Sequence, residues 1–198
     1  MASIVYMAGL HTRSADSSKG AKIERLCDAL NLKRVVKRND LCGVKLHFGE
    51  YGNDGYINPA FVRRVVDKIK NAGAKPFLTD TCTLYSGMRH NAVDHLNVAT
   101  LHGFTPAVVG APVIIADGLF GTNDMPVEID RKHFKEVMVA DGIRRAPALV
   151  VLSHFKGHEM AGFGGAIKNL AMGGASVQGK RAQHATHVQI DESKCIVC

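Results

Sequence analysis

Short apolar runs rich in β-branched residues alternate with amphipathic segments along this chain, and this alternation restricts the fold more than any other feature. The pattern is typical of a mostly parallel sheet whose strands are connected and covered by helices. We therefore predict an α/β fold with three layers, of the Rossmann-like or flavodoxin-like kind. The expected strands are residues 4–7, 41–48, 75–80, 111–116 and 148–153, and the expected helices are residues 18–30, 59–71 and 86–102.

The apolar runs and the cysteines bound the class of protein. The longest apolar run, residues 146–152, is far too short to cross a bilayer. No basic and apolar leader precedes the first expected strand, so we expect no membrane partner and a cytoplasmic location. Five cysteines are an odd number, and Cys27, Cys42 and Cys82 stand alone in apolar surroundings. We expect these three to be buried small apolar side chains and not a disulfide framework.

The net charge of +7 favours anionic partners. The densest basic run, residues 33–38, lacks the aromatic side chains that stack on bases, so we do not expect nucleic acid as a partner. Two accounts of the charge stay open. It lies on a solvated surface, or part of it lies in a pocket that attracts a small anionic ligand or substrate.

Polar residues gather where the expected strands end. In open parallel sheets, ligands bind outside the carboxyl ends of the strands. Alternation along residues 41–48 puts Lys45 and His47 on one face and apolar side chains on the other. A parallel strand covered on both faces is expected to be apolar on both, so these two residues need an explanation. Asp80 ends the next strand, although it would also serve as a helix cap.

The last expected strand runs into His154-Phe155-Lys156-Gly157-His158. If this stretch stays extended, the side chains of residues 154, 156 and 158 project on the same side. We predict one shared pocket in which the imidazoles donate or accept protons, Asp80 orients one of them, and the lysines bind an anionic group. The expected catalytic residues are His47, His154, His158 and Asp80, and the expected anion-binding lysines are Lys45 and Lys156.

A glycine-rich stretch follows, and it enters a helical segment at Lys168 and Asn169. Free backbone N–H groups at such a turn hold phosphates and carboxylates. The stretch fits neither the P-loop pattern nor the dinucleotide fingerprint. The alternative is that its glycines only allow the loop to pack tightly on the sheet. The expected anion-binding residues here are Gly162, Gly164, Gly165, Lys168 and Asn169.

A divalent metal at the histidines is a further hypothesis. Residues 154–158 together with His47 offer enough imidazoles for a zinc-like site. A lysine between two ligands disfavours a cation unless a carboxylate such as Asp80 compensates for its charge.

The sequence ends on Cys195-Ile196-Val197-Cys198. This spacing matches the first two ligands of the bacterial Cys-x2-Cys-x2-Cys-x3-Cys-Pro cluster motif. We expect the chain to be a piece cut from a longer protein, because a natural chain rarely stops at the second ligand of such a motif. Taken alone, the pair would also fit half a zinc site or a redox dithiol.

Residues 45–50, residues 80–81 and above all residues 153–158 with 162–173 resemble the uncharacterised iron–sulfur centre proteins, a family catalogued as a domain of unknown function. The resemblance implies that Cys195 and Cys198 are the first ligands of a 4Fe-4S cluster that is complete only in the whole protein. The chain turns polar after Gly174, so we expect an α/β domain over residues 1–175 and a polar, irregular lead-in to a ferredoxin-like segment over residues 176–198.

Three functions fit these features. The leading hypothesis is an iron–sulfur oxidoreductase that acts on an anionic small molecule at the strand ends. A second is a non-catalytic electron carrier or cluster-bearing regulator, with a redox partner protein. A third is a redox-independent, metal-assisted enzyme that uses the His-Lys-His strand end.

Overall fold

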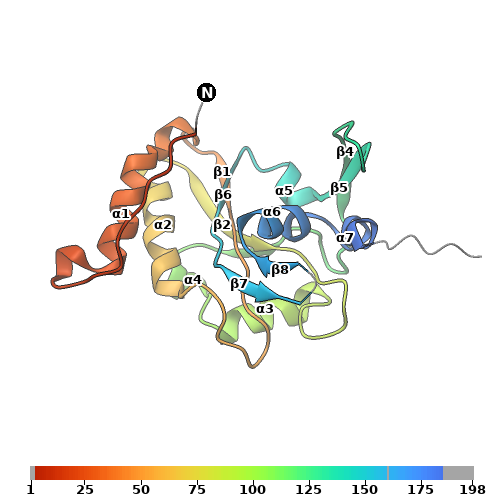
Figure 1. Cartoon of the computed structure of the whole chain (residues 1–198), viewed down its shortest axis with the longest axis horizontal. Coiled ribbons are helices and arrows are strands. Elements are labelled where there is room, and N and C mark those ends of the chain that lie inside the picture. The colour runs from red at the N-terminus through yellow and green to blue at the C-terminus, as the bar shows by residue number, and fades with distance from the viewer. Residues whose placement is uncertain (1–2, 160, 185–198) are drawn as a thin grey trace, which may run out of the picture.

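The centre of the molecule is a four-stranded parallel sheet (Figure 1). The computed structural model describes residues 3–159 and 161–184. The strands lie in the order β3 (Val113–Ile115), β2 (Lys75–Asp80), β1 (Leu41–Lys45) and β6 (Ala148–Val151). Lys45 is in register with Thr79 of β2 and Val151 of β6. The carboxyl ends of these three strands therefore lie next to one another at the same end of the sheet. The prediction of a three-layer α/β fold with a mostly parallel sheet is confirmed.

Helices cover both faces of this sheet (Figure 1). α1 (Lys19–Leu30) and α2 (Pro59–Asn71) lie on one side, and α6 (Ala166–Gly174) lies on the other. The sequence sets the start of α2 locally, because the Asn58 side chain accepts a hydrogen bond from the Ala60 N–H at 2.8 Å and proline occupies the first turn.

The hydrophobic core lies between the sheet and α1 and α2. α2 contributes an apolar stripe of residues spaced three and four apart. β1 contributes its alternate residues, and the chain continues this alternation past the end of the strand. The fully buried members of the core include Val44, Leu46, Phe48, Val62, Val66, Ile69 and Leu78.

The remaining elements surround this unit. β4 (Asp124–Glu128) and β5 (Glu136–Ala140) form an antiparallel hairpin, and β7 (Lys156–His158) and β8 (Gly162–Gly164) form a second, shorter one. The other helices are the 3-10 turns η1 (Ala15–Ser17) and η2 (Leu32–Arg34), with α3 (Ala92–Leu101), α4 (Pro106–Val109), α5 (Asp141–Arg144) and α7 (Val177–His184). No helix in residues 3–159 and 161–184 is long and apolar enough to span a membrane.

The strand expected over residues 4–7 is wrong. These residues form no strand, and Val5 and Met7 are 85% and 94% exposed. An apolar run becomes a strand only where it pairs with a neighbour, and both edges of the described sheet, β3 and β6, leave it unpaired.

The helix expected over residues 86–102 begins later, at Ala92. Asn91 caps it by accepting a hydrogen bond from the Asp94 N–H at 3.0 Å. Gly87 has a φ of +142°, which lies outside the helical region. The preceding residues therefore form a loop, and this loop carries Arg89 back to the sheet.

Two further local expectations need correction. The glycine-rich stretch is not a simple turn, because Gly162–Gly164 pairs with Lys156–His158 as β8 and only Gly165 caps α6. The stretch after residue 175 is not irregular at first, because Val177–His184 is helical. Cys27, Cys42 and Cys82 are buried and free, as expected. Cys195 and Cys198 lie outside the described residues.

Candidate functional site

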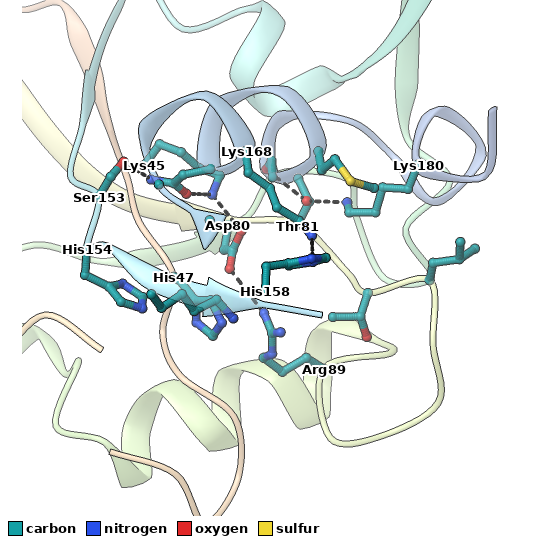
Figure 2. A pocket seen from close by; sticks show the side chains of 18 of the residues that line it. Lys45, His47, Asp80, Thr81, Arg89, Ser153, His154, His158, Lys168 and Lys180 are labelled. Carbon is teal, nitrogen blue, oxygen red and sulfur yellow. Dashed lines mark hydrogen bonds and ion pairs between the residues drawn. The ribbon is translucent and has the colours of Figure 1, made fainter. Parts of the chain in front are cut away.

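A pocket of about 230 Å³ opens at the carboxyl ends of β1, β2 and β6. Figure 2 shows its side chains converging from the sheet, from the β7–β8 hairpin and from α6 and α7. The residues that line it are Lys45, His47, Asp80, Thr81, Thr83, Leu84, Tyr85, Arg89, Ser153, His154, Lys156, His158, Gly164, Gly165, Lys168, Asn169, Met172, Gly173, Lys180 and His184.

The floor of the pocket is a buried ion pair. Lys45 Nζ lies 2.9 Å from Asp80 Oδ1, and these side chains are only 1% and 6% exposed. Lys45 also donates to Asn169 Oδ1 at 2.7 Å, and the Asn169 amide donates to Ser153 Oγ at 2.8 Å. A Cβ on Gly173 would lie 2.7 Å from Lys45 Nζ, so glycine lets α6 approach this ammonium group closely. The pair therefore ties β1, β2 and α6 together.

Arg89 supplies a second cation to the same carboxylate. Its Nη1 lies 3.5 Å from Asp80 Oδ2, and its Nη2 donates to Tyr85 Oη at 2.7 Å and to Glu50 Oε1. Burial raises the pKa of Glu50, but the hydrogen bonds from Arg89 and Tyr85 outweigh burial and lower it. The guanidinium therefore spans two ionised carboxylates.

Asp80 is the electrostatic centre of the site. Burial raises its pKa, but Lys45, His95 and Arg89 together outweigh burial and hold the pKa well below its usual range. His95 lies behind the pocket, fully buried against Phe48, with Nε2 3.7 Å from Asp80 Oδ2. Burial lowers the pKa of His95 to about 4, although Asp80 opposes the shift. His95 is therefore neutral at neutral pH.

His47 and His154 form an imidazole pair at one side of the pocket (Figure 2), with ring centroids 5.8 Å apart. His47 Nδ1 accepts a hydrogen bond from the Gly49 N–H at 2.6 Å, so the neutral ring carries its proton on Nε2. Burial and then Arg89 lower the pKa of His47 to about 4. Burial and then Lys156 also lower the pKa of His154. Among the described residues, His154 Nε2 is buried without a hydrogen-bond partner.

The β7–β8 hairpin brings two lysines and a histidine together. A Cβ on Gly164 would lie 3.8 Å from carbons of both Lys156 and Lys168, so both alkyl chains pass over this glycine. His158 Nδ1 accepts a hydrogen bond from the Ala161 N–H at 3.2 Å, and His158 Nε2 is hydrogen-bonded to Lys168 Nζ. Burial and then Lys156 lower the pKa of Lys168.

Lys180 enters the pocket from α7. It is 8% exposed and donates to Thr81 Oγ1 at 2.6 Å and to the Ala175 carbonyl. Both acceptors are uncharged, which leaves the charge of Lys180 without an ion-pair partner within 4 Å in the described part of the chain. Burial lowers its pKa, with Asp117 and Asp80 opposing the shift.

The charges of the pocket do not balance. Asp80 is the one carboxylate among the lining residues that the structure describes, and it already pairs with two cations. Five basic side chains line the same space, namely Lys45, Arg89, Lys156, Lys168 and Lys180. In a partly enclosed site, such an excess attracts anions.

Metal ligands are not assembled in the described part of the chain. Within residues 3–159 and 161–184, no group of three or more His, Cys, Asp and Glu side chains is placed to hold a metal ion. Both ring nitrogens of His158 are already hydrogen-bonded, Nδ1 to the Ala161 N–H and Nε2 to Lys168 Nζ. The described cysteines are three buried, separate thiols and provide no ligand set for a 4Fe-4S cluster.

The pocket brings together most residues that the sequence singled out. His47, Asp80, His154, His158, Lys45, Lys156, Gly164, Gly165, Lys168 and Asn169 all line it, whereas Gly162 does not. Arg89, Lys180 and His95 were missed. Arg89 was assigned to a helix and Lys180 to an irregular segment, while His95 had no signal beyond a lone histidine in an amphipathic stretch.

Comparison with known proteins places the chain in a family. No curated protein and no solved structure matches the chain. Residues 43–197 match DUF362, described as a domain of unknown function, and this match covers well over half of the 198 residues. The chain therefore belongs to the DUF362 family.

Proposed function

We propose that this chain binds a small anionic molecule, through a carboxylate or phosphate group, in the strand-end pocket and performs acid–base chemistry on it. The observation that carries the proposal is the charge imbalance, with five basic side chains and one carboxylate lining one cavity. Lys45 and Arg89 are held by Asp80, so the cations left for a ligand are Lys156 and Lys180.

The imidazoles have distinct roles in this proposal. His47 is neutral at neutral pH and presents Nε2–H, so it donates a hydrogen bond to an oxygen that gains negative charge and is too weakly basic to remove a proton. His154 offers the ring nitrogen without a partner, so it is the stronger candidate to exchange a proton with the ligand.

The binding test is calorimetric titration of the full chain with inorganic phosphate, lactate and pyruvate at low salt. We expect at least one of them to bind with a Kd in the millimolar range or tighter, about −4 kcal/mol or better. Lys180→Gln is expected to weaken binding about 10- to 100-fold, because a hydrogen bond to a charged group contributes about 1.5–3 kcal/mol.

Lys156→Gln is the second variant, since the Lys156 side chain is exposed. Lys135→Gln, an exposed lysine of the β4–β5 hairpin, makes the same change in net charge and is the matched control. If Lys180→Gln, Lys156→Gln and Lys135→Gln all bind with the same affinity, or if none of the three anions binds, the proposal is wrong.

Electron transfer is a separate proposal, based on the spacing of Cys195 and Cys198. The test purifies the protein without oxygen, together with any residues that its gene encodes after Cys198, and measures iron, acid-labile sulfide and the EPR spectrum after reduction. About four irons for each cluster are expected. A Cys195→Ser, Cys198→Ser double variant should lose them, and Cys27→Ala should keep them. A parent protein without iron would rule out the iron–sulfur oxidoreductase.

A further inference from the structure

His158 is held by two hydrogen bonds that together fix its tautomer. The Ala161 N–H donates to Nδ1 at 3.2 Å, so Nδ1 carries no proton. A neutral imidazole has one donor and one acceptor nitrogen, so the proton is on Nε2. Nε2 is the atom that contacts Lys168 Nζ (Figure 2).

This tautomer bears on whether the Lys168 amine is charged. A lysine ammonium group has three donors and no acceptor, and it cannot accept the Nε2–H of His158. The contact is satisfied when the Lys168 amine is uncharged and its lone pair accepts that proton. This arrangement of donors and acceptors favours the uncharged, nucleophilic form of this side chain.

The surroundings of Lys168 favour the same form. The side chain is half-buried, and its alkyl chain passes over Gly164 beside that of Lys156, so a second ammonium group stands close by. Burial and then Lys156 lower the pKa of Lys168. No carboxylate in the described part of the chain forms an ion pair with Lys168 within 4 Å, whereas Lys45 has Asp80. Desolvation and a neighbouring cation are the two features that activate a lysine as a nucleophile.

We propose that Lys168 is a carbonyl-reactive amine and that the pocket takes an anionic carbonyl compound of the 2-oxo acid class, which Lys168 binds as an imine. The inference deepens the proposed function and rests on it, because the carboxylate of the ligand is held by the cations described above. Lys156 and Lys180 are placed in the same cavity for that carboxylate, and His47 Nε2–H is available to the carbonyl oxygen.

The covalent step balances without a further reactant. The Lys168 lone pair forms a C–N bond to the carbonyl carbon, and the amine loses its two protons in the overall sum. The carbonyl oxygen receives both and leaves as water, so amine and carbonyl give imine and water. His158 passes its Nε2 proton to the departing hydroxyl group and takes up the proton that the nitrogen loses. No atom is oxidised or reduced.

The experiment traps the imine. The full chain is incubated with pyruvate at pH 7, the imine is reduced with added borohydride, and the stable adduct is located by peptide mass spectrometry. An ordinary lysine, with a pKa of about 10.4, has roughly one neutral amine in a few thousand at this pH. We expect at least about tenfold more adduct on Lys168 than on Lys135, because burial and Lys156 lower the pKa of Lys168 and so raise the fraction of its amine that is uncharged.

Two variants and one control ligand separate the outcomes. Lys168→Arg keeps a basic side chain but cannot form an imine, so it should lose the adduct and still bind lactate. Lys156→Gln removes the neighbouring cation, so the pH at which trapping reaches half its maximum should rise. Lactate has no carbonyl at the reacting carbon and should give no adduct on the parent chain.

The failures are distinguishable. If lactate or pyruvate binds but the adduct is spread evenly over the lysines, or is unchanged in Lys168→Arg, the imine is ruled out and anion binding stands. If none of the tested anions binds and no adduct forms, the proposed function fails as well. Selective trapping on Lys180 in place of Lys168 would also overturn the assignment.

Discussion

Asp80→Asn lowers the free energy of unfolding by about 3–5 kcal/mol, because the substitution leaves the buried Lys45 ammonium without its anion and takes one of two carboxylates from the buried Arg89. Lys45 and Arg89 are 1% and 6% exposed in their side chains, and both contact Asp80. Lys45 cannot turn to water without breaking the contacts that join β1, β2 and α6. An amide has nearly the same shape, so the loss reports charge and not packing.

The measurement is urea unfolding at pH 7, with the native fold of each variant checked by circular dichroism. Asp67→Asn is the matched control, since Asp67 pairs with Arg63 one helical turn away and both side chains are over 40% exposed. Exposed pairs of this kind contribute about 0.3–0.5 kcal/mol. A loss in Asp80→Asn as small as that in Asp67→Asn would mean that the buried cluster is not held by this carboxylate.

Lowering the pH from 7 to 5 is expected to destabilise the protein by about 2 kcal/mol for each of His47 and His95. Their folded pKa is about 4, against 6.5 in the unfolded chain. Below pH 6.5 the unfolded chain binds protons that the folded protein does not, so stability falls with pH until about pH 4. At pH 5 the difference is 1.5 pH units, roughly 2 kcal/mol per group.

The lowered pKa of Asp80 affects stability only at a lower pH than the histidines do. A carboxylate with a depressed folded pKa stabilises the protein above its unfolded pKa of about 3.9, and that contribution is lost only as pH falls below this value. The free energy of unfolding should therefore fall over two pH ranges, first where the histidines titrate and then, at lower pH, where Asp80 titrates.

Unfolding free energies at pH 7, 6 and 5 test this. His95→Phe keeps an aromatic ring against Phe48 and should remove about half of the pH dependence. His133→Phe removes an exposed histidine and is the control for the loss of one imidazole. Stability that is flat from pH 7 to pH 5, or a slope unchanged in His95→Phe, would show that these rings are not held in the neutral form.

Local sequence patterns determined the frame of the molecule. The apolar stripe of α2, its Asn58–Pro59 start and the buried runs of β1, β2 and β6 are local signals, and each was correctly predicted. The alternation of β1 also separated Lys45 and His47 from the core residues Val44 and Leu46. Because parallel strands end at the same edge of a sheet, most of the pocket followed from these elements alone.

The tertiary structure decided which polar groups meet and in what state. Lys45 contacts Asn169 across 124 residues of sequence, and Lys180 contacts Thr81 across 99. The position of Arg89 depends on a loop that replaces the start of the expected helix, and the β4–β5 hairpin was not predicted. The hydrogen bond between Lys168 and His158 joins α6 to the β7–β8 hairpin, and only the paired hairpin brings these two residues together. Periodicity reports local burial, whereas the protonation and partners of a buried group depend on side chains brought together from distant segments.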